Sequence, residues 1–406
     1  MSMVAKPPPA PTGARPHVTT AVGVDDVHAV YEALSTTPDG FTVHPKLAKQ
    51  LEARDTMFHG GEIDWALGES LAIGTLLREG TSVRLTGQDS RRGTFSQRHS
   101  TLFDYETAAE YQPLAKLAQN PTQLWIYDSL LSEYACMGFE YGYSVSNPDA
   151  LVLWEGQFGD FVNGAQIIID QFIVAAEDKW DQFSGLVLLL PHGLEGQGPE
   201  HSSGRMERFL LLAAEDNIEV CNATTSAQYF HLLRRQMLRP GPKRPLVIYT
   251  PKSLLRARTS RSTIDDLTSR TFEEVLDDRN PPAAESVERV ILCSGKVAFD
   301  VMAARDAAGA NAAVVRVEQL YPWPKDYVSA ALGRYPNATE LIWLQEEPEN
   351  MGAWNFAKGR LYENHGDTHR IQRVSRPESG SPATGSAKIH AQESKLLLER
   401  ALRPLD

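Results

Sequence analysis

Two kinds of segment alternate along the chain. Short apolar runs, such as LVLLLP at 186–191, are typical of strands that are buried on both faces of a sheet. Between these runs lie segments with apolar residues at helical spacing, such as residues 64–80, which end in Gly80. Strands that alternate with helices predict parallel sheets covered by helices on both faces.

This alternation occurs twice. The first series has predicted strands at 83–87, 126–129, 150–154, 186–191 and 245–249, with helices over 134–143, 162–178 and 203–214. The second has predicted strands at 289–295, 312–320 and 340–348, with helices over 299–305 and 325–334 and a terminal helix after 375–393. The predicted fold class is α/β, with two tandem three-layer parallel-sheet domains.

Polar and proline-containing segments set the expected boundaries. Residues 1–20 are rich in Pro, Ala and Thr and predict a disordered tail, and residues 21–59 predict a helical connector. The first domain is expected over 60–255, a linker over 256–287 and the second domain over 288–406.

Composition excludes more than it identifies. The chain has 406 residues and a net charge of −12, which argues against nucleic acid or an anionic membrane surface as a partner. It contains no apolar run long enough to span a membrane and no apolar signal-peptide core, so a cytoplasmic location is expected. The three cysteines form no CxxC pair and indicate neither a zinc site nor a disulfide framework.

Candidate chemistry lies where the predicted strands end, because parallel sheets bind ligands at the carboxyl ends of their strands. The loop GQDSRRGTFSQRHS follows the strand at 83–87 and contains Gln88 and His99. Glu133 follows the strand at 126–129, at the start of a helix. These side chains are expected at the same edge of the sheet.

The next two strands end in similar loops. EGQFGDFVNG contains Gln157 and Phe158, and HGLEGQGPEHSSGR contains His201. Each residue also has a structural interpretation: a glutamate at a helix start interacts with the helix dipole, a loop histidine forms hydrogen bonds, and a phenylalanine packs in a core. The arginines at 91–98 fit a solvated surface or a structural cluster with carboxylates.

The usual cofactor motifs are absent, since no GxGxxG follows a strand and there is no Walker loop. The pattern alone supports an α/β enzyme with a site at residues 87–99, 133, 155–163 and 192–205.

These loops resemble one family closely. The segments are TGQDSRRGTFSQRHS, LSEYACMGFEYGYS, LWEGQFGDFVNGAQ and LLLPHGLEGQGPEHSSGRMERFL, followed by EQLYPWP, QEEPENMGAW and SPATGSAKIH. They are similar to the C-terminal half of the decarboxylating component of 2-oxoglutarate dehydrogenase, including the actinobacterial 2-oxoglutarate decarboxylases. The resemblance runs from about residue 60 to the end. It implies a thiamine-diphosphate pyrimidine-binding domain followed by a transketolase C-terminal-like domain.

The resemblance also implies roles. Glu133 matches the glutamate that hydrogen-bonds N1′ of the cofactor's aminopyrimidine and so helps its amino group to take the proton from the thiazolium C2. Phe158 would lie against the aminopyrimidine ring, and Gln88 and Gln157 are expected among the cofactor-binding residues. His201 matches an active-site histidine near the reacting carbonyl.

Three further positions are interpreted through the same family. His99 lies in an RH motif and is expected to line the same cavity in a catalytic role. Glu155 and Asp160 are expected to be structural or subunit-contact residues. The departures, Leu130 for a usual Pro and Gly156 for a usual Ala, remove no functional group.

The family's diphosphate-binding domain, with its GDG…N pattern, has no counterpart in the sequence. The resemblance therefore implies that thiamine diphosphate is shared with a separate α-like subunit, that the Mg²⁺ ligands lie on that partner and that this chain holds no metal. An α2β2 assembly and a lipoyl acyltransferase partner are expected. The initiating Met and the Pro-rich leader favour a separate subunit over a piece of a longer enzyme.

The expected function is the β-like half of a 2-oxo acid dehydrogenase or decarboxylase, inactive alone, with 2-oxoglutarate as the leading substrate. A carboligating thiamine-diphosphate subunit and a non-catalytic interaction module remain alternatives.

Overall fold

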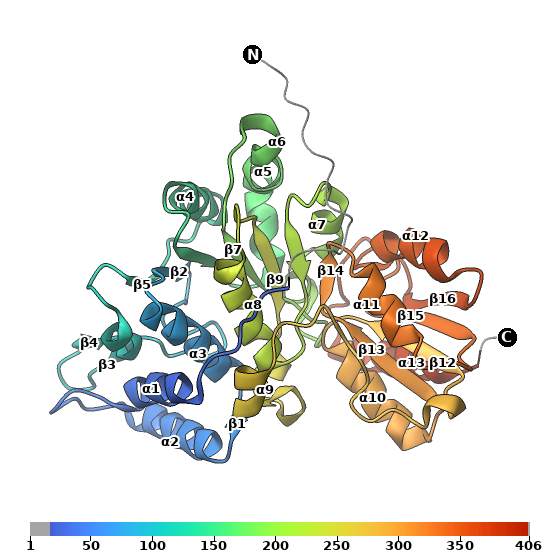
Figure 1. Ribbon diagram of the computed structural model, residues 1–406, viewed down its shortest axis with the longest axis horizontal. Helices are drawn as coiled ribbons and strands as arrows, with labels where there is room; N and C mark the ends of the chain where they lie inside the picture. The colour runs from blue at the N-terminus through green and yellow to red at the C-terminus, as the bar shows by residue number, and fades with distance from the viewer. Residues whose placement is uncertain (1–16, 405–406) are drawn as a thin grey trace.

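The larger domain is built on a seven-stranded sheet. In the computed structural model, which describes residues 17–404, the strand order is β14-β8-β9-β7-β6-β2-β5 (Figure 1). All neighbours are parallel except the β14–β8 pair. The strands are β2 (Val83–Gly87), β5 (Leu124–Asp128), β6 (Leu151–Glu155), β7 (Val187–Pro191), β8 (Glu219–Cys221), β9 (Leu246–Thr250) and β14 (Gln319–Tyr321).

Helices cover both faces of this sheet because the central strands are apolar on both. In β6, Leu151 and Leu153 belong to one buried cluster and Val152 and Trp154 to another. The first cluster includes α1 (Val24–Ser35), α3 (Trp65–Arg78) and α8 (Ser226–Leu238). The second includes α4 (Glu133–Ser146), α7 (Met206–Leu212) and the helical turns η2 (Gly159–Ala165), α5 (Gln166–Ile168), η3 (Ile169–Ile173) and α6 (Ala176–Trp180).

The smaller domain repeats this three-layer arrangement. Its sheet has the order β11-β13-β12-β15-β16, parallel except at the β11 edge. The strands are β11 (Val275–Leu276), β12 (Arg289–Cys293), β13 (Ala312–Val317), β15 (Glu340–Pro348) and β16 (Arg370–Arg376). One face packs on α10 (Val297–Ala308) and α13 (Ala387–Leu402), the other on α11 (Lys325–Leu332) and α12 (Trp354–His365). The predicted class of two tandem α/β domains is confirmed.

One strand departs from the prediction and connects the domains. The apolar run at 312–320 divides at Glu318, so that β13 stays in the smaller sheet while β14 pairs with β8 of the larger one. The buried Glu318 carboxylate accepts a hydrogen bond from the Thr224 backbone N–H at 2.7 Å, which holds the crossing point. The larger sheet is therefore mixed.

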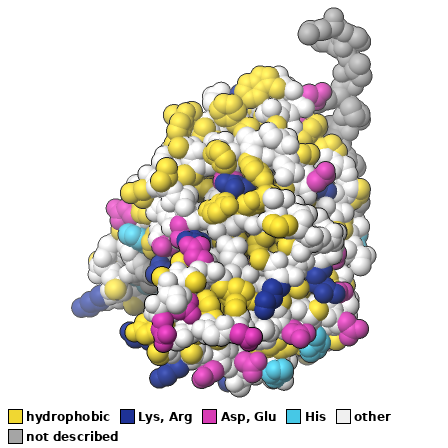
Figure 2. Space-filling model, turned by 90° about the vertical axis from the view of Figure 1, so that its left-hand side faces the viewer, with side chains coloured by type: hydrophobic (Ala, Val, Ile, Leu, Met, Phe, Trp, Pro, Cys, Tyr) yellow, Lys and Arg dark blue, Asp and Glu magenta, His cyan; other side chains and the backbone are white. Residues whose placement is uncertain are grey.

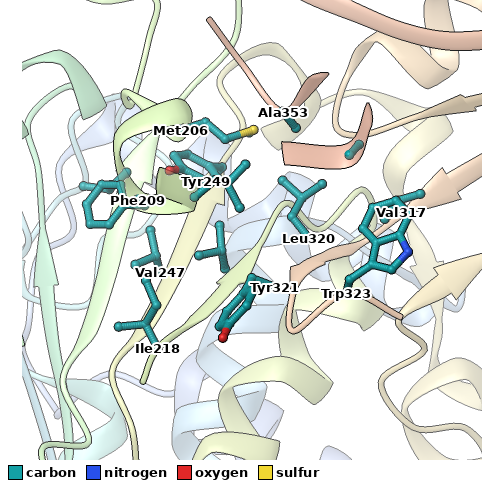
Figure 3. Close-up of a cluster of buried hydrophobic side chains, with 14 of the residues drawn as sticks. Met206, Phe209, Ile218, Val247, Tyr249, Val317, Leu320, Tyr321, Trp323 and Ala353 are labelled. Atoms are coloured by element: carbon teal, nitrogen blue, oxygen red, sulfur yellow. The ribbon is translucent and has the colours of Figure 1, made fainter. Parts of the chain in front are cut away.

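A single hydrophobic core runs across the domain boundary. Phe209, Val247 and Tyr249 of the larger domain share a buried cluster with Leu320 and Trp323 (Figure 3). This shared core fixes the two sheets relative to each other.

The segment expected to be a linker is structured. It contains β10 (Ser262–Thr263), which pairs with β1 (Glu62–Ile63), and α9 (Ile264–Ser269), which packs on α8. Its last strand, β11, forms the edge of the smaller sheet. A short hairpin of β3 (Leu102–Phe103) and β4 (Glu110–Tyr111) and the helix α2 (Pro45–His59) complete the larger domain.

The disordered tail expected over residues 1–20 extends too far toward the C-terminus, because residue 20 is packed in the fold. Thr20 is fully buried, its hydroxyl lies 2.8 Å from Nδ1 of His231, and its carbonyl accepts from Nε of Arg234. The expectation for residues 1–16 lies outside the described residues. Nowhere in residues 17–404 is there a helix with the length and hydrophobicity needed to cross a bilayer.

Candidate functional site

Glu133 and Gln88 meet at the carboxyl edge of the larger sheet. Their loops arrive together because β2 and β5 are parallel neighbours. Nε2 of Gln88 donates a hydrogen bond to Oε1 of half-buried Glu133 at 3.0 Å. Oε2 of Glu133 accepts no hydrogen bond from any residue in 17–404. As the first residue of α4, Glu133 also sits where the helix dipole stabilises a negative charge. The result is an oriented carboxylate with one free oxygen.

Phe158 and His201 form a second pair, from the loops that follow β6 and β7. Their ring centroids are 4.4 Å apart and the rings are nearly perpendicular, at 87°. The contact depends on Gly159, where an added Cβ would lie only 2.7 Å from the Cα of Gly204. The absence of a side chain at Gly159 therefore lets the two loops touch.

The loop after β2 connects the two pairs. Nε2 of Gln157 donates to Oδ2 of Asp89 at 2.7 Å, and Oγ1 of Thr94 donates to Oε1 of Gln157 at 3.2 Å. The ring of Phe95 lies 5.7 Å from that of Phe158. The structure thus brings five sequence-predicted residues into one contiguous group: Gln88, Glu133, Gln157, Phe158 and His201.

Two buried charges hold the backbone around His201. Oδ2 of Asp160 accepts from the backbone N–H groups of Ser202 and Ser203 at 2.9 and 2.8 Å. From the loop after β9, Nζ of Lys252 donates to the carbonyl of His201 at 2.7 Å, and burial lowers the pKa of this lysine. The sequence analysis missed Lys252, whose only signal was its position three residues beyond the predicted strand at 245–249.

His99 has a different environment from the other predicted residues. No hydrogen bond or ring contact joins it to Glu133, Phe158 or His201. Its backbone φ is 48°, in the left-handed region, and its buried Nε2 has no hydrogen-bond partner in the described part of the chain. Burial, and then the positive charges of Arg54 and Arg256, lower its pKa.

Glu155 belongs to a buried charge cluster beneath the site. The Arg98 guanidinium donates to Glu155 at 2.6 and 2.7 Å and also to Glu69, which accepts from the hydroxyl of Tyr229. Arg98 is therefore part of a structural cluster, whereas Arg92 of the same run is exposed. Glu155 and Asp160 were expected to be structural or subunit-contact residues, and both form contacts within the chain.

The surface beside Glu133 is strongly apolar. Leu130 and Leu131 are 83% and 84% exposed. Tyr134 and Phe139 on α4, and Ile167 on α5, which contacts α4, add further exposed apolar area. Figure 2 shows hydrophobic side chains gathered over the upper part of this face. Patches of this kind are typical of surfaces that another protein covers.

Within the described residues, no group of three or more His, Cys, Asp and Glu side chains is placed to hold a metal ion.

The architecture and the grouping at the strand ends define a class of domain. Residues 61–258 match the family described as transketolase, pyrimidine binding domain, and residues 261–402 match the family described as 2-oxoglutarate dehydrogenase C-terminal. The chain therefore carries a transketolase-type pyrimidine-binding domain. More particularly, it corresponds to the C-terminal part of 2-oxoglutarate dehydrogenase E1 components.

Several relatives with such names align with nearly the whole chain. The chain is 50% identical over 392 residues to a 2-oxoglutarate dehydrogenase E1 component of Cupriavidus necator. This alignment covers 95% of this chain and 41% of the relative. It is 50% identical over 388 residues to that of Rickettsia felis, covering 94% and 40%. It is 48% identical over 397 residues to a multifunctional 2-oxoglutarate metabolism enzyme of Mycobacterium sp. (strain JLS), covering 95% and 31%. The chain thus spans less than half the length of these relatives.

Proposed function

We propose that this chain forms one wall of a thiamine-diphosphate site and, with a diphosphate-binding α-like subunit, decarboxylates a 2-oxo acid. The observation that carries the proposal is the Glu133 carboxylate, oriented by Gln88 through one oxygen and free at the other. The names of the relatives make 2-oxoglutarate the first substrate to test.

The residues present fit the aminopyrimidine part of this cofactor. The free oxygen of Glu133 can accept a hydrogen bond from a protonated ring nitrogen, and the half-buried ring of Phe158 offers an apolar surface nearby. Bound thiamine diphosphate supplies a heterocycle that stabilises a carbanion. His201, with its backbone held by Lys252, can exchange a proton with the reacting carbonyl group.

The other wall of the site is assigned to the partner. The chain covers 31% to 41% of its relatives, and apolar side chains are exposed directly beside Glu133. We assign the Mg²⁺ ligands and the diphosphate contacts to the partner, in an α2β2 assembly. In this scheme the acyl group passes to a lipoyl acyltransferase.

Reconstitution tests the proposal. The chain would be mixed with a candidate α-like subunit, Mg²⁺ and thiamine diphosphate, and CO₂ release measured from 2-oxoglutarate and other 2-oxo acids. Glu133→Gln should reduce turnover at least about a hundredfold, because a neutral amide does not stabilise the positive charge on the protonated ring nitrogen as a carboxylate does. Asp149→Asn, an exposed change beyond the other end of α4, should leave turnover unchanged. Full turnover by Glu133→Gln would overturn the assignment.

A further inference from the structure

A cavity of about 710 Å³ lies outside the candidate cofactor site, because its lining contains none of the five residues grouped there. It is bounded by the C-terminal half of α2, residues 96–97 of the loop after β2, and residues 255–261. Its volume lies in the range of small-molecule sites, about 300–1,000 Å³. The lining contains four basic residues, Arg54, Arg256, Arg258 and Arg261, and two acidic residues, Glu62 and Asp64.

The charge of this cavity is opposite to that of the whole chain. The chain has 52 acidic and 40 basic residues, whereas arginines outnumber carboxylates in the cavity lining. Both carboxylates are already engaged. Glu62 pairs with Arg261 at 2.6 Å, and Asp64 accepts from the backbone N–H of Leu67 as the N-cap of α3. Positive charge is therefore left over.

The remaining three guanidinium groups have no counter-ion. Across residues 17–404, no carboxylate lies within ion-pair distance of Arg54, Arg256 or Arg258. Arg54 donates to the carbonyl of Gln97 at 3.1 Å and Arg256 to that of Phe95 at 2.7 Å. These bonds orient the two guanidinium groups without neutralising them. Burial lowers the pKa of Arg54 even though the charges of Asp64 and Glu69 act in the opposite direction, so a bound anion would offset the remaining cost of burying this charge.

We propose that this cavity binds a small phosphate-bearing metabolite. Guanidinium groups bind phosphate through paired, charge-assisted hydrogen bonds, and a phosphate presents oxygens to donors that approach from several directions. The ligand acts as an effector, because Arg54 and Arg256 hold the carbonyls of the same loop that carries Phe95 against Phe158. The binding of the anion is independent of the proposed activity, whereas its role as an effector rests on the proposed function of the site at Phe158.

Calorimetric titration of the full chain with inorganic pyrophosphate at constant ionic strength tests the site. Saturable binding is expected, and Arg256→Gln with Arg258→Gln should weaken it at least about tenfold. Both side chains are exposed, so their loss should leave the fold intact. Arg403→Gln removes an equally exposed arginine at the end of α13 and should leave binding unchanged.

Three outcomes would overturn the site. They are the absence of saturable binding, an equal loss in Arg403→Gln, and binding of glutarate as tight as that of pyrophosphate. The last would assign the site to dicarboxylates.

His99 reports whether the anion lies beside Arg54 and Arg256. It faces the positive charges of Arg54, Arg92 and Arg256 and the backbone carbonyl of Ser96. Pyrophosphate bound between Arg54 and Arg256 should raise the pKa of His99, measured by NMR titration of the imidazole. Binding that leaves the pKa of His99 unchanged would contradict the proposed position of the anion. The role as an effector would be overturned if saturating pyrophosphate left the turnover of the reconstituted enzyme unchanged.

Discussion

Nε2 of His192 lies 2.7 Å from Oε1 of Glu347, which joins the loop after β7 to the end of β15 in the other domain. The backbone N–H of Gly204 donates to Nδ1 of the same ring at 3.0 Å. Nδ1 is thus an acceptor, so the ring carries its proton on Nε2, and this N–H group donates a hydrogen bond to Glu347. Both side chains are buried. The smaller domain therefore helps to hold the segment that carries His201.

Removing this contact should destabilise the protein. Glu347→Ala leaves a buried imidazole N–H without an acceptor, and we expect the free energy of unfolding to fall by about 2 kcal/mol. Urea denaturation measures the change. Glu349→Ala removes a more exposed ion pair with Arg373 and should cost less than about 1 kcal/mol. Equal effects of the two changes would contradict the role given to His192 and Glu347.

His231 should make the stability of the protein depend on pH. Burial lowers the pKa of His231 to about 4, and the ring lies between the Thr20 hydroxyl and the carbonyl of Asp266, each at 2.8 Å. From about pH 6.5 down to about pH 4, the unfolded chain binds a proton that the folded chain refuses. The free energy of unfolding should therefore fall as the pH is lowered through this window, by about 3 kcal/mol in all.

Denaturation at several pH values, compared with His231→Gln, isolates this contribution. Glutamine keeps an amide donor for the Asp266 carbonyl but does not titrate. The variant should lose less stability than the wild type between pH 6.5 and 4, and parallel curves would contradict the assignment.

Gly159 should not tolerate a methyl group. An alanine Cβ there would lie 2.6 Å from the carbonyl oxygen of Pro191 and 2.7 Å from the Cα of Gly204. We expect Gly159→Ala to cost about 2 kcal/mol and to separate Phe158 from His201. Gly142→Ala is a matched control, because nothing lies within 4 Å of its Cβ and alanine favours the helix. Thermal unfolding of both variants, with turnover of the reconstituted enzyme, would detect the difference.

Lys252 is predicted to act on catalysis through His201. Lys252→Met removes the donor to the His201 carbonyl and should lower kcat of the reconstituted enzyme by about tenfold to a hundredfold. Binding of thiamine diphosphate should change little, and Lys252→Arg should restore part of the rate. The control is Lys388→Met, an exposed change on α13. A loss of cofactor affinity without a fall in kcat would contradict a positioning role.

The strands that the sequence predicts best are those with continuous apolar runs. β7 lies where LVLLLP indicates, and β15 where ELIWLQEEP does because of its apolar run LIWL at 341–344, since strands buried on both faces are rich in apolar side chains. β8 was missed because it has only three residues. α8 was missed because it buries polar side chains that are hydrogen-bonded within the protein, including Gln228, His231, Arg234, Arg235 and Gln236. These polar side chains interrupt the apolar residues Tyr229, Phe230, Leu232 and Leu233 of α8 in the sequence and obscure its helical pattern.

The sequence predicts contacts of the candidate site between residues at the ends of adjacent strands. It does not predict contacts between residues that lie far apart in the sequence. Glu133 and Gln88 meet because their strands are adjacent and parallel. Glu347 lies 155 residues from His192 in the sequence, and no local pattern indicates their contact. The catalytic role given to His99 stays a prediction, since its charged neighbours come from the cavity lined by Arg54 and Arg256.

The crossing of the chain from β13 into β14 limits how the molecule can move. A hinge between the sheets would have to break the β14–β8 ladder and expose apolar side chains around Leu320. The two domains should therefore tilt and translate together as one rigid body. In the proposed assembly, any opening that admits substrate, or closure that excludes water, is therefore expected from the opposite wall of the site.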